Sequence, residues 1–487
     1  MKKLFPLILL ALITQHIQGQ NGVAGYWRAV SVVPDGTPNG AVLQFTMELM
    51  GEGASVTGTV TGAPIAISGG RVEGTSVTLN GLNTDNKQPI TLTGELSGTE
   101  IVFAAVGLSP EPIHLVARRV TRVEALTGSV SDAALIQQLL RQTNVPGVSI
   151  AVIKDFKVVG AFAHGVADSE TRAPVTTRTM FQAGSISKTV AAMASLKAVQ
   201  EKRFRLDQDV NTILKSWKLP VGQFTTAGPV TPRTLMSHVS GTGDGFGFPG
   251  YAPGTPLPTL QQLLDGLPPS NTRAVRLERA PMTAEEYSGG GVMVQQLALM
   301  DAVGKPFAQI AREWIFVPLE MTDSTFEQPL PVARQSQAAR AHTPTGAKPQ
   351  TNEPWRVFPE QAAAGLWTTP SDLATFAIEV QLALRGRPSR VLSPAVAREM
   401  ITPVGVGGYG VGFALLKQGE GWYFMHNGST FGFRASLWAH STKGYGAAIM
   451  TNGAAGDTLI PQVLRLIQQE YKWDAVDLPV PRRYGPE

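Results

Sequence analysis

Two patterns of apolar and polar residues divide the chain. Between residues 22 and 122, short runs alternate apolar with polar side chains, as at 56–61 and 90–93, and glycine-containing turns such as 68–70 separate them. Successive side chains of a strand point to opposite faces, so this alternation buries one face of each strand. Short strands at this spacing predict a small all-β domain, either a β-sandwich or a β-barrel. We find no set of catalytic side chains in it and interpret it as a structural or accessory domain.

A mixed pattern of helices and strands begins near residue 131. Ser131 is the expected N-cap of the first helix, and Pro461 is expected in the first turn of the last one, where proline is tolerated. The predicted elements are a helix over 132–142, a buried strand over 145–153, a helix over 185–203, strands over 432–438 and 445–450, and a helix over 459–471. This order predicts a three-layer α/β domain over 131–475, in which helices flank an antiparallel sheet and a mostly helical subdomain interrupts it.

The N-terminal residues have the pattern of a secretory signal peptide. Lys2 and Lys3 precede an apolar run over 4–13, and the small residue Gly19 follows. That run is too short to span a bilayer. We therefore expect a cleavable signal peptide over 1–19 and a periplasmic or secreted protein, with a short N-terminal anchor as the alternative. No later segment is apolar enough to cross a membrane, so the mature chain is expected to have no integral membrane segment.

The composition is that of a globular protein and excludes several kinds of chemistry. Of 487 residues, 43% are hydrophobic and 16% are charged, and the formal net charge is +4. A chain of this length favours at least two domains. No run of five or more lysines and arginines occurs, so no nucleic-acid partner is expected. The absence of cysteine excludes disulfides and thiolate metal sites. We also find no metal-binding spacing or phosphate loop, and expect neither metal nor cofactor.

The first candidate for catalysis is Gly-Ser-Ile-Ser-Lys-Thr at 184–189. If Ser185 begins a helix, Lys188 lies one turn further on the same face, within reach of the serine Oγ. A serine hydroxyl is a weak nucleophile at neutral pH and needs a nearby base. The unpaired N–H groups of a helix N-terminus also favour an oxyanion. The alternative is an N-cap serine and a surface lysine on an ordinary helix.

Two further elements contain groups that can move protons or bind an oxyanion. Tyr287 precedes a glycine run that includes Gly289, and from there its phenol can point into a cleft. His426 and Gly428 form the one His-x-Gly of the chain, and the next N–H, that of Ser429, can donate to an oxyanion. Taken singly, each element also fits a structural role, as a packing tyrosine beside a turn or as a satisfied histidine.

In this order, the three elements resemble the motifs of the penicillin-recognising serine hydrolases, which include class C β-lactamases, DD-peptidases and family VIII carboxylesterases. Ser185 and Lys188 match the Ser-x-x-Lys motif, Tyr287 matches the tyrosine motif, and His426 with Gly428 matches a His-x-Gly motif of esterase and peptidase relatives. Three other segments are similar to this family, namely Leu-Met-Ser-His-Val-Ser-Gly at 235–241, Pro-Leu-Glu-Met-Thr-Asp-Ser-Thr at 318–325 and Ala-Gly-Leu-Trp-Thr-Thr-Pro-Ser-Asp-Leu at 364–373. The resemblance extends over about residues 131–473.

The resemblance implies an enzyme that cleaves an ester or amide through an acyl-enzyme. Ser185 is then the nucleophile, and Lys188 and Tyr287 handle its protons, with the choice of base between them open. The N–H groups of Ser185 and Ser429 bind the oxyanion in this mechanism. The implied substrates are small-molecule esters, peptides or lactams, with cell-wall material as one source. The alternative is a non-catalytic protein that keeps the fold to bind peptidoglycan or β-lactams.

Two departures from the family motifs affect the expected specificity. Gly289 stands where these proteins have an asparagine that grips a substrate amide. No Lys-Ser/Thr-Gly occurs, so His426 is the expected substitute for a substrate-binding cation, weaker and dependent on pH. Both changes favour an esterase, or a peptidase of altered specificity, over a strong β-lactamase. His238 could suggest a Ser-His-Asp triad, but no Gly-x-Ser-x-Gly elbow exists, and we predict a buried structural histidine.

Overall fold

The chain forms two compact units, Met1–Ala125 and Leu126–Glu487, which are described separately. The computed structural model describes residues 22–32, 44–61, 65–84, 87–108, 112–120, 128–243, 248–418, 421–474 and 482–483. The predicted signal peptide over 1–19 lies outside these residues and stays a prediction. Within the described ranges, no helix combines the length and the hydropathy that a membrane span requires.

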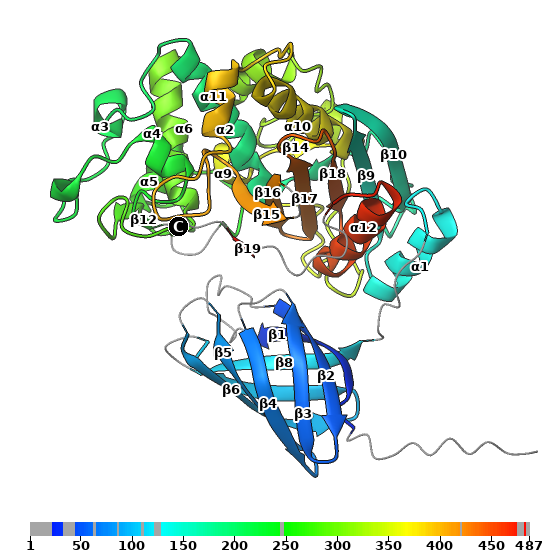
Figure 1. The fold of residues 1–487 in the computed structure, drawn as a ribbon. Coiled ribbons are helices and arrows are strands. Elements are labelled where there is room, and N and C mark those ends of the chain that lie inside the picture. The colour runs from blue at the N-terminus through cyan, green and yellow to red at the C-terminus, as the bar shows by residue number, and fades with distance from the viewer. Residues whose placement is uncertain are drawn as a thin grey trace, which may run out of the picture. The chain divides into compact units, whose positions relative to one another are not determined.

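The first unit is a closed barrel of eight antiparallel strands (Figure 1). Each strand pairs with the next along the chain, and β1 pairs with β8, with Tyr26 opposite Val120 and Val32 opposite His114. The strands are β1 Gly25–Val32, β2 Gln44–Glu52, β3 Ser55–Thr61, β4 Ile65–Glu73, β5 Ser76–Asn83, β6 Pro89–Ser97, β7 Glu100–Val106 and β8 Ile113–Val120. The predicted all-β domain is confirmed, and of the two alternatives the structure has the barrel.

Alternating side chains fill the interior of the barrel. In β5 and β7 every second residue is buried, including Leu79 and Phe103. Trp27 is fully buried, and its indole N–H donates to the carbonyl oxygen of Val23 at 2.7 Å. The pairing of β1 with β8 also removes the unpaired strand edges that an open sheet of this kind would expose.

The second unit is built on a seven-stranded antiparallel sheet in the order β10-β9-β18-β17-β16-β15-β19. The chain leaves this sheet after β10 and returns to it at β15. Its strands are β9 Gly147–Lys154, β10 Lys157–Gly165, β15 Ala414–Gln418, β16 Gly421–Thr430, β17 Phe433–His440, β18 Gly446–Thr451 and β19 Arg482–Arg483. Two small sheets form between them, from β11 Phe181–Gln182 with β14 Trp367–Thr368 and from β12 Thr242–Gly243 with β13 Arg276–Leu277.

Helices flank the large sheet and fill the segment between its two halves. They are α1 Ala133–Thr143, α2 Ser187–Gln200, α3 Val210–Ile213, α4 Pro232–Met236, α5 Leu260–Asp265, α6 Gly289–Val303, α7 Phe307–Ala311, α8 Val332–Gln335, α9 Gln361–Ala364, α10 Pro370–Leu384, α11 Pro394–Glu399 and α12 Gly456–Glu470. Two 3-10 turns, η1 Gly184–Ile186 and η2 Thr225–Ala227, and one π-helical turn, η3 Arg312–Phe316, complete the set.

The sheet is the middle of three layers (Figure 1). On one face, Val148, Ile150 and Ile449 are buried together with apolar residues of α1 and α12. On the other face, the alternate strand residues, such as Ala151 and Met450, are buried together with residues of α2 and α10. Because both faces are covered, β9 is a nearly continuous apolar run. The three-layer α/β fold predicted from the sequence is confirmed.

The ends of three helices differ from the sequence prediction. Asp132, rather than Ser131, is the N-cap of α1, since its carboxylate accepts from the N–H groups of the first turn. The predicted helix over 185–203 starts as the 3-10 turn η1 and ends at Gln200 as α2. Pro461 lies inside α12, beyond its first turn, because the helix begins at Gly456. A proline at this position removes one backbone hydrogen bond of the helix.

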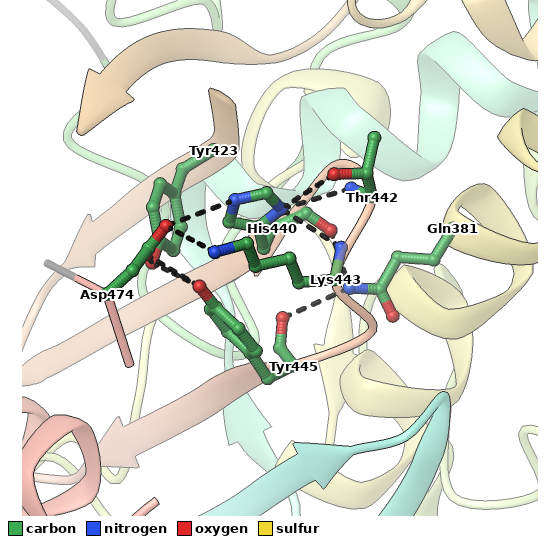
Figure 2. A network of polar contacts seen from close by, with 7 residues as sticks. All are labelled: Gln381, Tyr423, His440, Thr442, Lys443, Tyr445 and Asp474. Atoms are coloured by element: carbon green, nitrogen blue, oxygen red, sulfur yellow. Dashed lines mark hydrogen bonds and ion pairs between the residues drawn. The ribbon is translucent and has the colours of Figure 1, made fainter. Parts of the chain in front are cut away.

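The largely buried carboxylate of Asp474 binds the segment after α12 to the sheet (Figure 2). Asp474 accepts hydrogen bonds from Tyr423 Oη at 2.9 Å, Tyr445 Oη at 2.6 Å and Lys443 Nζ at 3.0 Å. The Nε2 of His440 lies 3.9 Å from the same carboxylate. The three donors come from β16 and from the turn that leads into β18, and His440 lies at the end of β17. One side chain therefore links three neighbouring strands to the C-terminal segment.

We expect Asp474→Ala to destabilise the second unit by about 3 kcal/mol, because the buried hydroxyl of Tyr423 and the half-buried hydroxyl of Tyr445 lose their acceptor. The control is Asp457→Ala, which removes a more exposed carboxylate that pairs with Arg434 at 2.6 Å and should cost less than about 1 kcal/mol. Thermal melts of both variants, followed by near-UV circular dichroism, measure the difference. Equal losses for the two variants would show that the Asp474 cluster contributes no more than a surface ion pair.

Candidate active site

Ser185 lies in η1, and Lys188 lies in the first turn of α2, which follows directly. The Nζ of Lys188 donates to Ser185 Oγ at 3.1 Å and to the carbonyl oxygen of Ala363 at 2.8 Å. Lys188 is 4% exposed, so little water competes for its ammonium group. The structure thus brings together the hydroxyl and the amine that the sequence singled out.

The turn that carries Ser185 packs against the end of β16. β15 pairs with only the first half of β16, which leaves the second half to η1. A Cβ on Gly428 would overlap the carbonyl oxygen of Ala183, and a Cβ on Gly184, whose φ is +53°, would lie 2.7 Å from the backbone nitrogen of Ser429. Only glycine fits at either position. The N–H groups of Ser185 and Ser429 therefore belong to two segments in direct contact.

Tyr287 directly precedes α6, and its ring reaches the same site. The Nζ of Lys188 lies 4.9 Å from the centroid of the ring, a distance that permits a cation–π interaction. The next residue, Ser288, is the N-cap of α6, and its hydroxyl accepts from the N–H of Gly291 at 2.9 Å. Tyr287 is 43% exposed. Its orientation therefore depends on the few side chains that contact it.

His238 is buried, as the sequence predicts, and it fixes the backbone beside Tyr287. Its Nδ1 accepts from the backbone N–H of Ser288 at 3.1 Å, and its carbonyl oxygen accepts from the N–H of Glu286 at 2.7 Å. An imidazole that accepts a hydrogen bond at Nδ1 is neutral. The ring centroids of His238 and Tyr287 are 4.3 Å apart. His238 thus has a structural role and also contacts the ring of Tyr287.

The glycine run after Tyr287 forms the start of α6. Gly289 is the first residue of the helix and is buried, so it offers no side chain to a substrate. A Cβ on Gly291 would lie 2.7 Å from Oγ1 of Thr242. The glycine run therefore allows α6 to pack closely against β12, and it forms helix instead of a flexible turn.

His426 is a buried neutral group, which corrects one expectation. Its Nδ1 lies 2.7 Å from the carbonyl oxygen of Asn427, so this nitrogen holds the proton, while Nε2 has no hydrogen-bond partner among the described residues. Burial, and then the nearby charge of Lys188, lower the pKa of His426 to about 3. From the sequence, His426 was expected to be a cation whose charge depends on pH. With this pKa the imidazole is uncharged near neutral pH and cannot attract a substrate carboxylate.

Tyr409 belongs to the site and is not among the residues predicted from the sequence. Its ring centroid lies 4.7 Å from that of His238, 6.2 Å from Tyr287 and 6.1 Å from His426. The residue sits in the stretch 405–412, which is rich in glycine. An aromatic residue beside a glycine run is the signal that singled out Tyr287, and the same signal is present here.

The segment around α9 holds Lys188 from a second side. The carbonyl oxygen of Ala363 accepts from the lysine, and the N–H of Ala362 donates to Gln296 Oε1 at 2.8 Å. Glu360 precedes this helix, is fully buried, and has no hydrogen-bond partner for either carboxyl oxygen among the described residues. Burial raises the pKa of Glu360 to about 8. A backbone acceptor such as Ala363 has no signature in the sequence.

Comparison with known proteins assigns this architecture to a family. The sequence profile of the family described as beta-lactamase matches residues 133–470, which is more than half of the chain. The chain belongs to the beta-lactamase family. This confirms the resemblance drawn from the motifs and makes the protein a member of a family of serine hydrolases.

Relatives of this beta-lactamase family member include proteins with several names. Penicillin-binding protein 4 of Amycolatopsis lactamdurans is 26% identical over 341 residues, which cover 67% of this chain and 86% of the relative. A beta-lactamase of Pseudomonas fluorescens is 23% identical over 304 residues, which cover 59% and 72% of the two chains. The D-amino acid amidase from Ochrobactrum anthropi SV3 has a TM-score of 0.55 at 22% identity, with 69% of this chain and 99% of that chain covered. The structural likeness shows the fold.

The rest of the described part of this family member contains a cavity but no metal-binding group. A cavity of about 940 Å³ lies among α7, η3 and the loops that follow, but Ser185 does not line it. Within the described residues, no group of three or more His, Cys, Asp and Glu side chains could hold a metal ion. The chemistry of the described structure is therefore centred on the start of α2.

The buried carboxyl of Glu360 should make stability depend on pH. Its pKa is raised from 4.5 to about 8 in the folded state, so stability is lost as the pH rises from 4.5 to about 8. Glu360→Met removes the titrating group and should raise the free energy of unfolding more at pH 8.5 than at pH 5, by about 4 kcal/mol. Denaturant unfolding at both pH values measures this. A gain of the same size at both would mean that Glu360 does not titrate in this range.

Proposed function

We propose that this protein is a serine hydrolase that cleaves an ester or an amide through an acyl-enzyme on Ser185. The observation that carries the proposal is the hydrogen bond of 3.1 Å from Lys188 Nζ to Ser185 Oγ. The turn that contains Ser185 packs against the end of β16 that contains Gly428. A buried amine beside a hydroxyl at a helix N-terminus is the arrangement that activates a serine. Membership of the beta-lactamase family supports the same chemistry.

The proposed mechanism assigns each step to groups at this site. The Oγ of Ser185 attacks the substrate carbonyl, and its proton passes to the Lys188–Tyr287 pair, which accepts it either as the neutral amine of Lys188 or as the phenolate of Tyr287. The N–H groups of Ser185 and Ser429 donate to the oxyanion. The leaving group takes a proton from the same pair and departs. Water then attacks the acyl-serine and gives a proton to the coupled pair, the pair passes this proton to Ser185 Oγ, and the acyl group leaves as the carboxylic acid.

The proposed substrates are small uncharged esters, ahead of peptides and lactams that bear a carboxylate. The imidazole of His426 is neutral, Gly289 has no side chain, and the ammonium group of Lys188 is bound by two oxygens. These groups supply neither an amide nor an uncommitted cation for a carboxylate-bearing substrate. We further propose a periplasmic or secreted location, a hydrolase domain over 131–475, an accessory barrel over 22–122, and cell-wall material as one source of substrate.

We expect hydrolysis of p-nitrophenyl butyrate to exceed that of nitrocefin and of a D-Ala-D-Ala peptide, measured side by side. Ser185→Ala should lower kcat/KM for the ester at least about a thousandfold and abolish labelling by a fluorophosphonate probe. Lys188→Ala should cause a loss of similar order. A protein that only binds its ligand would keep most of its affinity after Lys188→Ala, and labelling that survives Ser185→Ala would contradict the proposed nucleophile.

The pH dependence of the ester reaction should contain no ionisation of His426. Its pKa is lowered from 6.5 to about 3, so the imidazole is neutral throughout the range from pH 5 to pH 8. We expect His426→Gln to leave the shape of the plot of log kcat/KM against pH unchanged over this range, whatever its effect on the absolute rate. An inflection near pH 6.5 that is present in the parent enzyme and lost in the variant would contradict the neutral state.

A further inference from the structure

Four rings form a connected set beside the nucleophile. The ring of Tyr287 lies 4.3 Å from His238, 6.2 Å from Tyr409 and 6.0 Å from His426, measured between centroids. Tyr409 contacts the same two imidazoles, at 4.7 Å and 6.1 Å. Each tyrosine thus touches both histidines and the other tyrosine. Lys188 Nζ approaches the set over the face of Tyr287.

The two tyrosines differ in how the protein holds them. Tyr287 is 43% exposed, whereas Tyr409 is 8% exposed and packs in a small apolar cluster with Ala414 of β15 and Met425 of β16. Tyr409 meets His238 with its ring plane at 89° and His426 at 67°, the edge-to-face geometry that aromatic pairs favour. The buried ring is therefore anchored to the sheet, and the exposed ring rests on it.

A separate contact joins the two loops that carry these rings. The carboxylate of Glu285, two residues before Tyr287, accepts a hydrogen bond from the backbone N–H of Gly408, the residue before Tyr409. In addition, a Cβ on Gly407 would lie 2.5 Å from Oε2 of Glu285. The loop of Tyr409 is thus docked directly on the segment of Tyr287.

We propose that Tyr409 is a positioning residue that fixes the ring of Tyr287 beside Lys188. The proposal rests on the proposed function, in which Tyr287 and Lys188 share the proton of Ser185. An exposed tyrosine ring has several rotamers available to it, and the observed one lies under the Nζ of Lys188. The ring of Tyr409 removes the alternatives because it fills the space beside His238 and His426. The contact acts through the ring face and edge, and the proposal assigns no role to the Tyr409 hydroxyl.

The experiment compares Tyr409→Leu with Tyr409→Phe in the full chain. Phenylalanine keeps the ring, and we expect kcat to stay within about threefold of the parent, whereas leucine should lower kcat about 10- to 100-fold with little change in KM for p-nitrophenyl butyrate. The pH profile of kcat should also shift in Tyr409→Leu, because the coupled titration of Lys188 and Tyr287 depends on their separation. Tyr445→Leu, in the Asp474 cluster, is the control for a lost tyrosine ring away from the site and should keep its rate.

Three results would overturn the proposal. They are an unchanged kcat and pH profile in Tyr409→Leu, an equal loss in Tyr409→Phe, which would assign the effect to the hydroxyl, and an effect on KM alone, which would indicate substrate contact. A readout that does not need turnover separates this proposal from the proposed function. In protein labelled with 3-fluorotyrosine, the fluorine resonance of Tyr287, assigned with Tyr287→Phe, should move towards the free amino acid in Tyr409→Leu. A resonance that stays in place contradicts the positioning role even if the enzyme has no esterase activity.

Discussion

The rest of the site depends on one backbone contact, where the turn at residues 183–185 lies against the end of β16. A side chain at Gly184 or Gly428 would collide with the opposing backbone, so the two segments can approach this closely only with glycine at both positions. The contact determines the place of Ser185 relative to the sheet, and it brings the N–H of Ser429 next to the turn. Because β15 stops pairing halfway along β16, this part of the strand remains available to the turn.

The groups around Lys188 stabilise its ammonium group with dipoles and rings. Its hydrogen bonds go to the hydroxyl of Ser185 and to the carbonyl of Ala363, and the ring of Tyr287 faces it. The two nearest imidazoles are neutral for different reasons. His238 accepts a backbone hydrogen bond at Nδ1, while burial and the lysine charge keep His426 unprotonated. Dipoles and rings of this kind can hold a proton on the lysine–tyrosine pair.

The sequence predicts local geometry well and long-range contacts poorly. Ser185 and Lys188 lie three residues apart, so helix geometry alone places them together, and the alternation of apolar residues in the barrel determines which side chains point inward. Tyr409 is more than 100 residues from Tyr287 along the chain, and their contact exists only after the sheet has formed. The burial of His426 is likewise a property of the folded state, which is why the sequence suggested a titrating cation. Sandwich and barrel share the same alternation of apolar and polar residues, and the pairing of β1 with β8 that closes the barrel appears only in the folded chain.

Two buried groups near this site oppose each other in their effect on stability. For His426, the pKa falls from 6.5 to about 3 on folding, so folding loses stability as the pH drops below 6.5. For Glu360, the pKa rises from 4.5 to about 8, so folding loses stability as the pH rises above 4.5. Between pH 4.5 and pH 6.5 the two contributions to the free energy of unfolding change with pH in opposite directions and cancel. Outside this window only one of the two groups changes the stability with pH. Together, His426 and Glu360 therefore leave the stability unchanged between pH 4.5 and pH 6.5. From pH 6.5 to about pH 8, the carboxyl group of Glu360 alone lowers the stability. Since both groups are uncharged from about pH 3 to about pH 8, neither one adds a charge near Lys188 over the range in which the serine has to react.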